Sequence, residues 1–397
     1  MTGQPRRQVA GGIWALAIAM GVGRFAYTPI LPLMQQELHF SDAFAGYLAS
    51  SNYAGYMLGA LLAGVIPWHG RRALYYRIGL TASVLTTAAM GMTHSPSLWF
   101  ALRFASGIVS AFVFVLASAM VLDVLAARGK TAWSGLFYGG VGAGILASGL
   151  LTPLFARLGS WQGAWIGLGL FSAVGAVFAW MWVQEGESAS GAGKTASDSA
   201  AAPPARWLPW LIASYGLEGL GYIVTGTFIV AIADQIPGFA GHSIWVWVLV
   251  GAAAAPSCIL WSSLAKKLGF VRTLLWSMLL QAAGIALPAW WSAPGGFVIS
   301  ALLFGATFMG ITTLAATLGR QMSPNRSSRV IGILTAVYGT GQMLGPAGAG
   351  ALFSLTGDYN GALLGAAAVV LAGGCLLLTG LRYDKQRRDR DNALRQH

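Results

Sequence analysis

The chain has 397 residues, of which 56% are hydrophobic and only 9% are charged, against roughly 25% charged residues in a typical soluble domain. So few charged side chains cannot cover a protein of this size in water. Composition therefore excludes a large soluble catalytic domain and indicates a chain solvated mostly by lipid. Cys258 and Cys375 both lie in apolar stretches and predict neither a metal cluster nor a disulfide framework. We expect no metal and no cofactor.

Twelve apolar runs are long enough to cross a bilayer, which takes about 20 helical residues. They lie near residues 11–34, 43–67, 74–93, 97–125, 131–156, 161–183, 207–232, 243–265, 272–291, 295–319, 330–355 and 361–381. The first run is too long for a cleavable signal peptide and contains Arg24, so we expect the protein to retain it.

The basic residues lie almost entirely in connections on one side of the predicted membrane. All of the 24 Lys and Arg residues except Arg24, Arg103 and Arg157 fall in these connections or in the two ends of the chain. The positive-inside rule then predicts that both termini are cytoplasmic. The net charge of +12 accordingly faces anionic lipid and does not indicate nucleic-acid binding.

One long connection divides the chain into two similar halves. It is rich in Ser, Ala, Gly and Pro, which is typical of a flexible linker. Matches at an offset of about 200 residues, such as Tyr138-Gly139 with Tyr338-Gly339, indicate an internal repeat. We therefore predict an all-α membrane protein of twelve transmembrane helices in two pseudo-symmetric six-helix bundles. The predicted parts are an N-terminal bundle (1–183), a cytoplasmic linker (184–206), a C-terminal bundle (207–382) and a basic tail (383–397).

Short motifs at the corresponding places of this pattern give it a family resemblance. Gly70-Arg71-Arg72 follows the second run, Arg103-x3-Gly107-x3-Ala111 lies in the fourth, and Gly341-x3-Gly345-Pro346 lies in the eleventh. With six plus six runs and a central linker, the whole chain resembles the major facilitator superfamily. The stretch from Gly21 to Pro32 resembles its YbfB/YjiJ-type bacterial branch.

The resemblance implies a transporter of the bacterial cytoplasmic membrane that works by alternating access, and not an enzyme. It also implies gating or motif roles for Gly70, Arg71, Arg72, Gly107, Gly341, Gly345 and Pro346. One position departs from the family pattern, because Pro67 replaces the acid of the loop after the second run. The conformational-switch role of that acid is therefore not implied here.

Three charged residues lie inside the apolar runs. Arg24 is near the middle of the first, Arg103 lies within the fourth, and Glu218 is near the middle of the seventh. Each costs about 2.5–3.5 kcal/mol at the bilayer centre unless it is paired or faces water. In the superfamily, the corresponding helices line a central cavity. We therefore predict that Arg24 and Arg103 bind substrate and that Glu218 carries protons.

Structural roles for the same residues remain open. Arg103 is also suited to capping backbone carbonyls of a neighbouring helix, and Arg24 to neutralising Glu218. The hydroxyl of Tyr222, one helical turn from Glu218, is suited to holding its carboxylate. Burial and nearby arginines act on the pKa of Glu218 in opposite directions, and the sequence does not decide the balance.

Two arginines and one carboxyl favour an anionic ligand, since Arg pairs with carboxylates through two hydrogen bonds. We expect proton-linked transport of a small carboxylate-like anion by a monomer, with anionic lipids at the cytoplasmic rim. The alternative is a proton-driven exporter of anionic or neutral drugs or metabolites. Further expected substrate-binding residues are Tyr27, Tyr138, Tyr222, Tyr338 and Gln342, and Tyr53, Tyr56 and Gln281 also lie in predicted lining runs.

Overall fold

The structure, a computed structural model, describes residues 4–66, 71–185, 203–239, 241–323 and 327–385. Within these ranges the chain forms helices and turns and contains no strand. The helices of the first half are α1 (Gln4–Leu16), a π-helical segment (Ala17–Val22), α2 (Tyr27–Leu38), α3 (Asp42–Val65), α4 (Arg72–Met90), α5 (Pro96–Ala127), α6 (Ser134–Ala156) and α7 (Ser160–Trp182). Those of the second half are α8 (Leu208–Asp234), α9 (Ile244–Leu268), α10 (Phe270–Trp290), α11 (Pro294–Met322), α12 (Ser327–Thr356) and α13 (Asn360–Leu377).

Nine helical segments of the described chain are long and apolar enough to cross a membrane. The predicted runs that correspond to α3, α4 and α12 are not among them, although these helices have 24, 19 and 30 residues. α3 contains Asp42 and Asn52, α4 contains Arg72 and Arg77, and α12 contains Arg329 and Gln342, and such residues lower the mean hydropathy. The protein is therefore a multi-pass helical membrane protein, and twelve spans remain a prediction.

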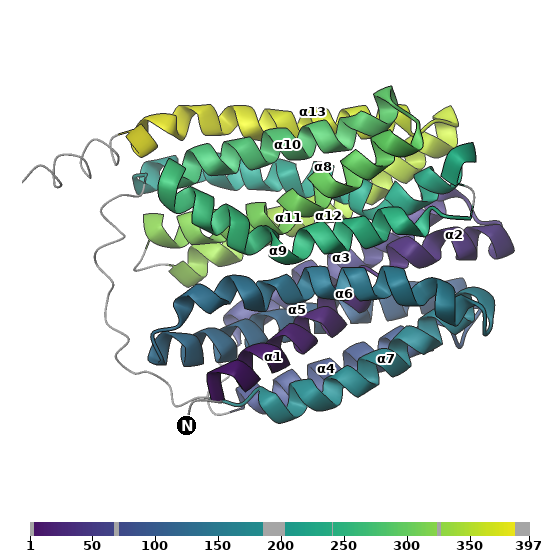
Figure 1. Cartoon of the computed structure of the whole chain (residues 1–397), viewed down its shortest axis with the longest axis horizontal. Coiled ribbons are helices and arrows are strands. Elements are labelled where there is room, and N and C mark those ends of the chain that lie inside the picture. The colour runs from purple at the N-terminus through teal and green to yellow at the C-terminus, as the bar shows by residue number, and fades with distance from the viewer. Residues whose placement is uncertain (1–3, 67–70, 186–202, 240, 324–326, 386–397) are drawn as a thin grey trace, which may run out of the picture.

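Two groups of helices lie side by side along their length (Figure 1). Helices α8 to α13 form the upper group and most of the first half forms the lower one, with α2 and α3 between them. At one end of the molecule α1 begins, α7 ends and α13 ends. We call this the basic end, because it is the predicted cytoplasmic side, and we call the other the opposite end.

The two halves meet along two pairs of helices, α3 with α12 and α6 with α9. Glycine permits these contacts. A Cβ atom at Gly46 would lie 2.2 Å from the carbonyl oxygen of Pro346, and one at Gly142 would lie 2.3 Å from the backbone nitrogen of Ala255. Small residues at such places let helix backbones approach closely. The seam between the halves is thus built on backbone contact.

Hydrogen bonds between the halves gather towards the opposite end. The Thr28 hydroxyl donates to the Gly226 carbonyl at 2.6 Å, and the Gln36 amide donates to Asp234 at 2.8 Å. Further bonds join Ala43 with Ser354, Asp42 with Tyr359, and Ser148 with Trp247. Towards the basic end, Thr340 donates to the thioether of Met57 at 3.5 Å and is exposed. In this conformation the halves are held together at the opposite end.

We expect Gly55→Ala to destabilise the packing of α3 on α5. A Cβ atom at Gly55 would lie 2.0 Å from the carbonyl oxygen of Phe104, and backbone cannot move aside as a side chain can. Overpacking of this kind costs about 1–3 kcal/mol, which a thermal melt in detergent detects as a lower Tm. Gly64→Ala on the same helix is the matched control, since a Cβ atom there meets nothing within 4 Å. Equal melting temperatures for the two variants would show that α3 and α5 do not approach each other this closely at Gly55.

Candidate functional site

The first transmembrane helix is broken near its middle, between the π-helical segment and α2. The backbone nitrogens of Gly23 and Phe25 donate to carbonyls five residues earlier, at 2.7 and 3.1 Å. Pro29 has no N–H to donate to Phe25, whose carbonyl accepts from Thr28 instead at 3.2 Å. π-Helical segments of this kind often occur at functional sites. The break places Arg24 where the regular helical ladder is interrupted.

Arg103 holds this break in place from α5. Its Nη1 and Nη2 atoms donate to the carbonyls of Gly23 and Arg24, each at 3.2 Å. The hydroxyl of Ser106 donates to the Gly23 carbonyl at 2.9 Å, and the Asn52 amide donates to the Arg103 carbonyl at 2.9 Å. Arg103 and Ser106 thus satisfy carbonyls that the interrupted helix leaves free, and Asn52 bonds to the backbone of Arg103 itself. The structure therefore gives Arg103 a backbone-capping contact, and its predicted role in substrate binding stays a prediction.

Arg24 joins the first half of the chain to the second. Its Nη2 atom donates to the side-chain oxygen of Gln342 on α12 at 2.6 Å. The amide nitrogen of Gln342 in turn donates to the hydroxyl of Tyr222 on α8. Three predicted site residues that lie far apart in the sequence thus form one continuous hydrogen-bonded row.

The guanidinium of Arg24 is surrounded by aromatic rings. Its Cζ atom lies 3.8 Å from the ring centroid of Tyr56, 5.0 Å from that of Tyr53 and 5.2 Å from that of Phe25. Aromatic faces attract a cation, but they do not neutralise its charge. Arg24 is only 2% exposed, and its Nε atom has no hydrogen-bond partner. No carboxylate of the described residues forms a salt bridge with it.

Glu218 lies in the same region but does not pair with Arg24. It is fully buried, and neither of its carboxyl oxygens has a hydrogen-bond partner among the described residues. Its polar neighbours are Gln281 on α10 and Tyr338 on α12, and the Gln281 amide is likewise unpartnered. Neutralisation of Glu218 by Arg24 is therefore not the arrangement in this conformation. The Tyr222 hydroxyl is bonded to Gln342 and does not hold the carboxylate.

The predicted tyrosines divide between this region and its surroundings. The Tyr27 hydroxyl donates to the Ala45 carbonyl at 3.1 Å, and the Tyr27 ring lies 4.9 Å from the Cζ atom of Arg103. Tyr338 stacks on Tyr222 with centroids 5.6 Å apart. Tyr138 instead packs beside Phe114 and Phe137, and none of its described ring contacts is with Arg24.

The predicted gating glycines lie at close helix contacts. A Cβ atom at Gly107 would lie 2.0 Å from the Asn52 carbonyl oxygen, and one at Gly341 or Gly345 would lie 2.6 Å from a carbonyl of α8. Pro346 lies inside α12, at the contact with α3 described above. These positions make packing contacts, and their roles in gating stay predictions.

The basic loop after α3 is only partly described. Gly70 and Pro67 lie outside the described residues, and Arg71 immediately precedes α4. Arg72 donates to Asp123 on α5 at 3.1 Å, and both side chains are partly exposed. The pair lies within the first half, so it joins α4 to α5 and does not cross the seam.

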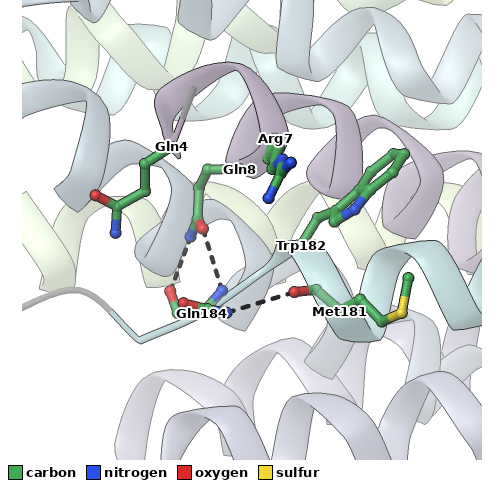
Figure 2. Close-up of a pocket in the computed structure, with 6 residues that line it drawn as sticks. All are labelled: Gln4, Arg7, Gln8, Met181, Trp182 and Gln184. Carbon is green, nitrogen blue, oxygen red and sulfur yellow. Dashed lines mark hydrogen bonds between the residues drawn. The ribbon is translucent and has the colours of Figure 1, made fainter. Parts of the chain in front are cut away.

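A hollow of about 360 Å³ lies at the basic end, where α1 begins and α7 ends (Figure 2), and Arg24 is not among the residues that line it. Gln8 and Gln184 face each other there: the Gln8 amide donates to the Gln184 carbonyl at 2.8 Å and accepts from its backbone nitrogen at 3.1 Å. Arg7 and Trp182 also line the hollow. The buried Gln8 amide is already satisfied, so we do not place the substrate site in this hollow.

Sequence reasoning missed Ser106, which caps the Gly23 carbonyl, and Asn52, which bonds to the Arg103 carbonyl. Both are small polar residues within apolar helices, and many such residues bond only to their own helix, as Ser110 does with Gly107. The one available signal was that Asn52 is an amide inside a run without charges. The π-helical segment gave no sequence signal beyond nearby glycine and proline.

Comparison with known proteins shows the family. The family model described as "Uncharacterised MFS-type transporter YbfB" matches residues 16–378. Tetracycline resistance protein, class G, of Vibrio anguillarum is 27% identical over 369 residues, which are 86% of this chain and 89% of that protein. The uncharacterised MFS-type transporter YceJ of Bacillus subtilis is 32% identical over 104 residues, 25% of this chain and 27% of that protein.

A solved structure shares the fold at low sequence identity. A variant of the nucleoside transporter NupG matches with a TM-score of 0.75 and 14% identity, covering 94% of this chain and 99% of that chain. This likeness shows the architecture and nothing about the substrate. The extent of the family match decides the assignment, and the chain belongs to the major facilitator superfamily of membrane transporters, in the family typified by YbfB.

Proposed function

We propose that the protein transports a small carboxylate-like organic anion by alternating access, coupled to protons, as a monomer in a bacterial cytoplasmic membrane. The observation that carries this proposal is the buried cation at Arg24, which no described carboxylate neutralises. A buried unpaired charge is costly, and intramembrane charges generally mark substrate or ion pathways. An anionic substrate supplies the missing partner.

The hydrogen bonds of Arg24 support a carboxylate in particular. The Nη2 atom of Arg24 donates to the side-chain oxygen of Gln342, and the adjacent Nε atom has no hydrogen-bond partner. A carboxylate binds two neighbouring guanidinium nitrogens at once, with shorter and stronger bonds than a neutral amide makes. In the proposed complex the substrate carboxylate replaces the Gln342 oxygen at Nη2 and also accepts a hydrogen bond from Nε.

The location of Arg24 suits alternating access. Arg24 belongs to the first half and Gln342 to the second, so a substrate between them contacts both halves, as expected for a site at the interface of repeats. The bonds at the opposite end close that side in this conformation. Alternating access then requires bonds such as Gln36 to Asp234 to break and re-form in each cycle.

Proton coupling is proposed for Glu218, which is linked to the anion site through aromatic residues. Its neighbour Tyr338 stacks on Tyr222, and Tyr222 accepts a hydrogen bond from the same Gln342 side chain that binds Arg24. A proton on Glu218 removes a negative charge near a site that must receive an anion. Protonation and anion binding therefore favour each other electrostatically.

Export is the second candidate function, and the similarity to a tetracycline resistance protein over 86% of the chain favours it. The arginine at the site suits anionic or neutral compounds better than cationic ones. Flux of radiolabelled carboxylates into right-side-out and inside-out membrane vesicles, at equal imposed pH gradients, separates the two. An exporter would accumulate the labelled compound only in inside-out vesicles whose interior is acidic, because the compound enters as protons leave.

We expect Arg24→Gln to abolish carboxylate transport, because the substrate then loses its charged partner in a buried site. Loss of one member of such a pair costs about 2–5 kcal/mol, so apparent affinity falls by a factor of about thirty or more. The measurement is uptake of radiolabelled mono- and dicarboxylates into proteoliposomes with an imposed pH gradient. Arg157→Gln, at an exposed helix end, is the matched control. Undiminished uptake by Arg24→Gln would rule out the anion site.

We expect Glu218→Gln to uncouple transport from the pH gradient while preserving exchange. The neutral amide mimics a permanently protonated carboxyl, so net uptake no longer responds to the gradient, whereas counterflow of labelled for unlabelled substrate persists. Glu37→Gln, on the exposed surface of α2, is the control and should behave as the native protein does. Gradient-driven uptake that survives in Glu218→Gln would show that the proton is carried elsewhere.

A further inference from the structure

Aromatic rings from both halves of the chain frame the proposed anion site. Tyr53, Tyr56 and Phe25 belong to the first half and lie around the Arg24 guanidinium. Phe25 meets Phe308 of α11 edge-on, with centroids 6.2 Å apart. The rings therefore continue across the seam into the second half, beside Gln342 and its partner Tyr222.

The rings of the second half share one orientation. Tyr222 is tilted by only 10° from Phe308 and by 18° from Phe304, with centroids 6.0 and 6.1 Å apart. Tyr338 is tilted by 16° from Tyr222 and lies 10° from Tyr215 at 4.2 Å. Aromatic pairs in proteins adopt offset-stacked and edge-to-face arrangements alike. The five rings thus form a stacked row with one common orientation, which a further aromatic ring can share and a saturated ring cannot.

The burial of the site residues limits the size of the ligand. Arg24 and Tyr222 are each 2% exposed and Phe308 is 3% exposed. A ligand must therefore gain its room by moving the Gln342 side chain and nearby rings, which suits a small flat body.

From these observations we infer that the transported anion is a small aromatic carboxylate of the benzoate class. The inference rests on the proposed function, since it takes the carboxylate at Arg24 as given. The carboxylate binds the Nε and Nη2 atoms of Arg24 in place of the Gln342 oxygen. The ring then lies against Tyr56 on one side and parallel to the Tyr222 and Phe308 rings on the other.

Four probes separate the charge of the ligand from its aromatic ring. Benzoate has both, cyclohexanecarboxylate has the charge with a saturated ring, hexanoate has the charge with an open chain, and benzamide has the ring without the charge. Binding to the purified full chain is measured by calorimetry and by the shift in Tm. We expect benzoate to bind about two- to tenfold more tightly than cyclohexanecarboxylate, since an aromatic contact gives about that factor beyond area burial. Benzamide should bind at least tenfold more weakly than benzoate.

Two pairs of variants test the rings themselves. Tyr56→Leu and Phe308→Leu should each reduce the preference for benzoate over cyclohexanecarboxylate several-fold, because each removes an aromatic face. Tyr56→Phe and Phe308→Tyr retain a ring and should keep the preference. The melting temperature of each variant without ligand shows whether it is folded. If Tyr56→Leu does not fold, Phe308→Leu provides the test. An unchanged preference in a folded leucine variant would overturn the role of that ring.

The outcomes distinguish this inference from the proposed function. Equal affinity for benzoate and cyclohexanecarboxylate would overturn the aromatic inference and leave the anion proposal standing. Benzamide binding as tightly as benzoate would overturn the anion proposal, since the charge would then contribute nothing. Binding of none of the four probes would overturn the aromatic inference.

Discussion

The arrangement of the site depends on one buried cation, Arg24, that no described carboxylate neutralises. Its position follows from the break in the first helix, which Arg103 stabilises by capping two freed carbonyls. The side chain then reaches across the seam and bonds to Gln342 of the other half. An unneutralised charge of this kind costs several kcal/mol unless a partner arrives. The same feature that destabilises the empty site therefore favours an anionic ligand.

The two halves respond to this site through a small set of contacts. Glycines such as Gly46 and Gly142 let the helices of the seam touch backbone to backbone. Side-chain bonds such as Gln36 to Asp234 close the opposite end, and such exposed bonds exchange readily with water. A rigid seam with exchangeable bonds at its ends suits rocking of one half against the other. In the proposed cycle, the substrate and the proton decide which end opens.

Much of the fold was predictable from the sequence, and the site only in part. Apolar runs, the asymmetry of basic residues and the repeat indicated two helical bundles, because lipid imposes these patterns. Arg24 and Glu218 stood out as charges within apolar runs. Their partners did not, since Gln342 is 318 residues from Arg24 and only packing brings the two together. The sequence also allowed a pairing of Arg24 with Glu218. In the structure Arg24 bonds to Gln342, whereas Glu218 lies beside Gln281 and Tyr338. The helices α3, α4 and α12 show that polar and charged residues within a helix weaken the hydropathy signal by which spans are recognised.

Substrate binding at Arg24 is tested most directly by an experimental structure of the protein with benzoate. If Arg24 is the anchor, density for the carboxylate lies against its Nε and Nη2 atoms, and the Gln342 side chain has moved away. The ring then lies parallel to that of Tyr222. Benzoate bound elsewhere, with the bond between Arg24 and Gln342 intact, would contradict the proposed site.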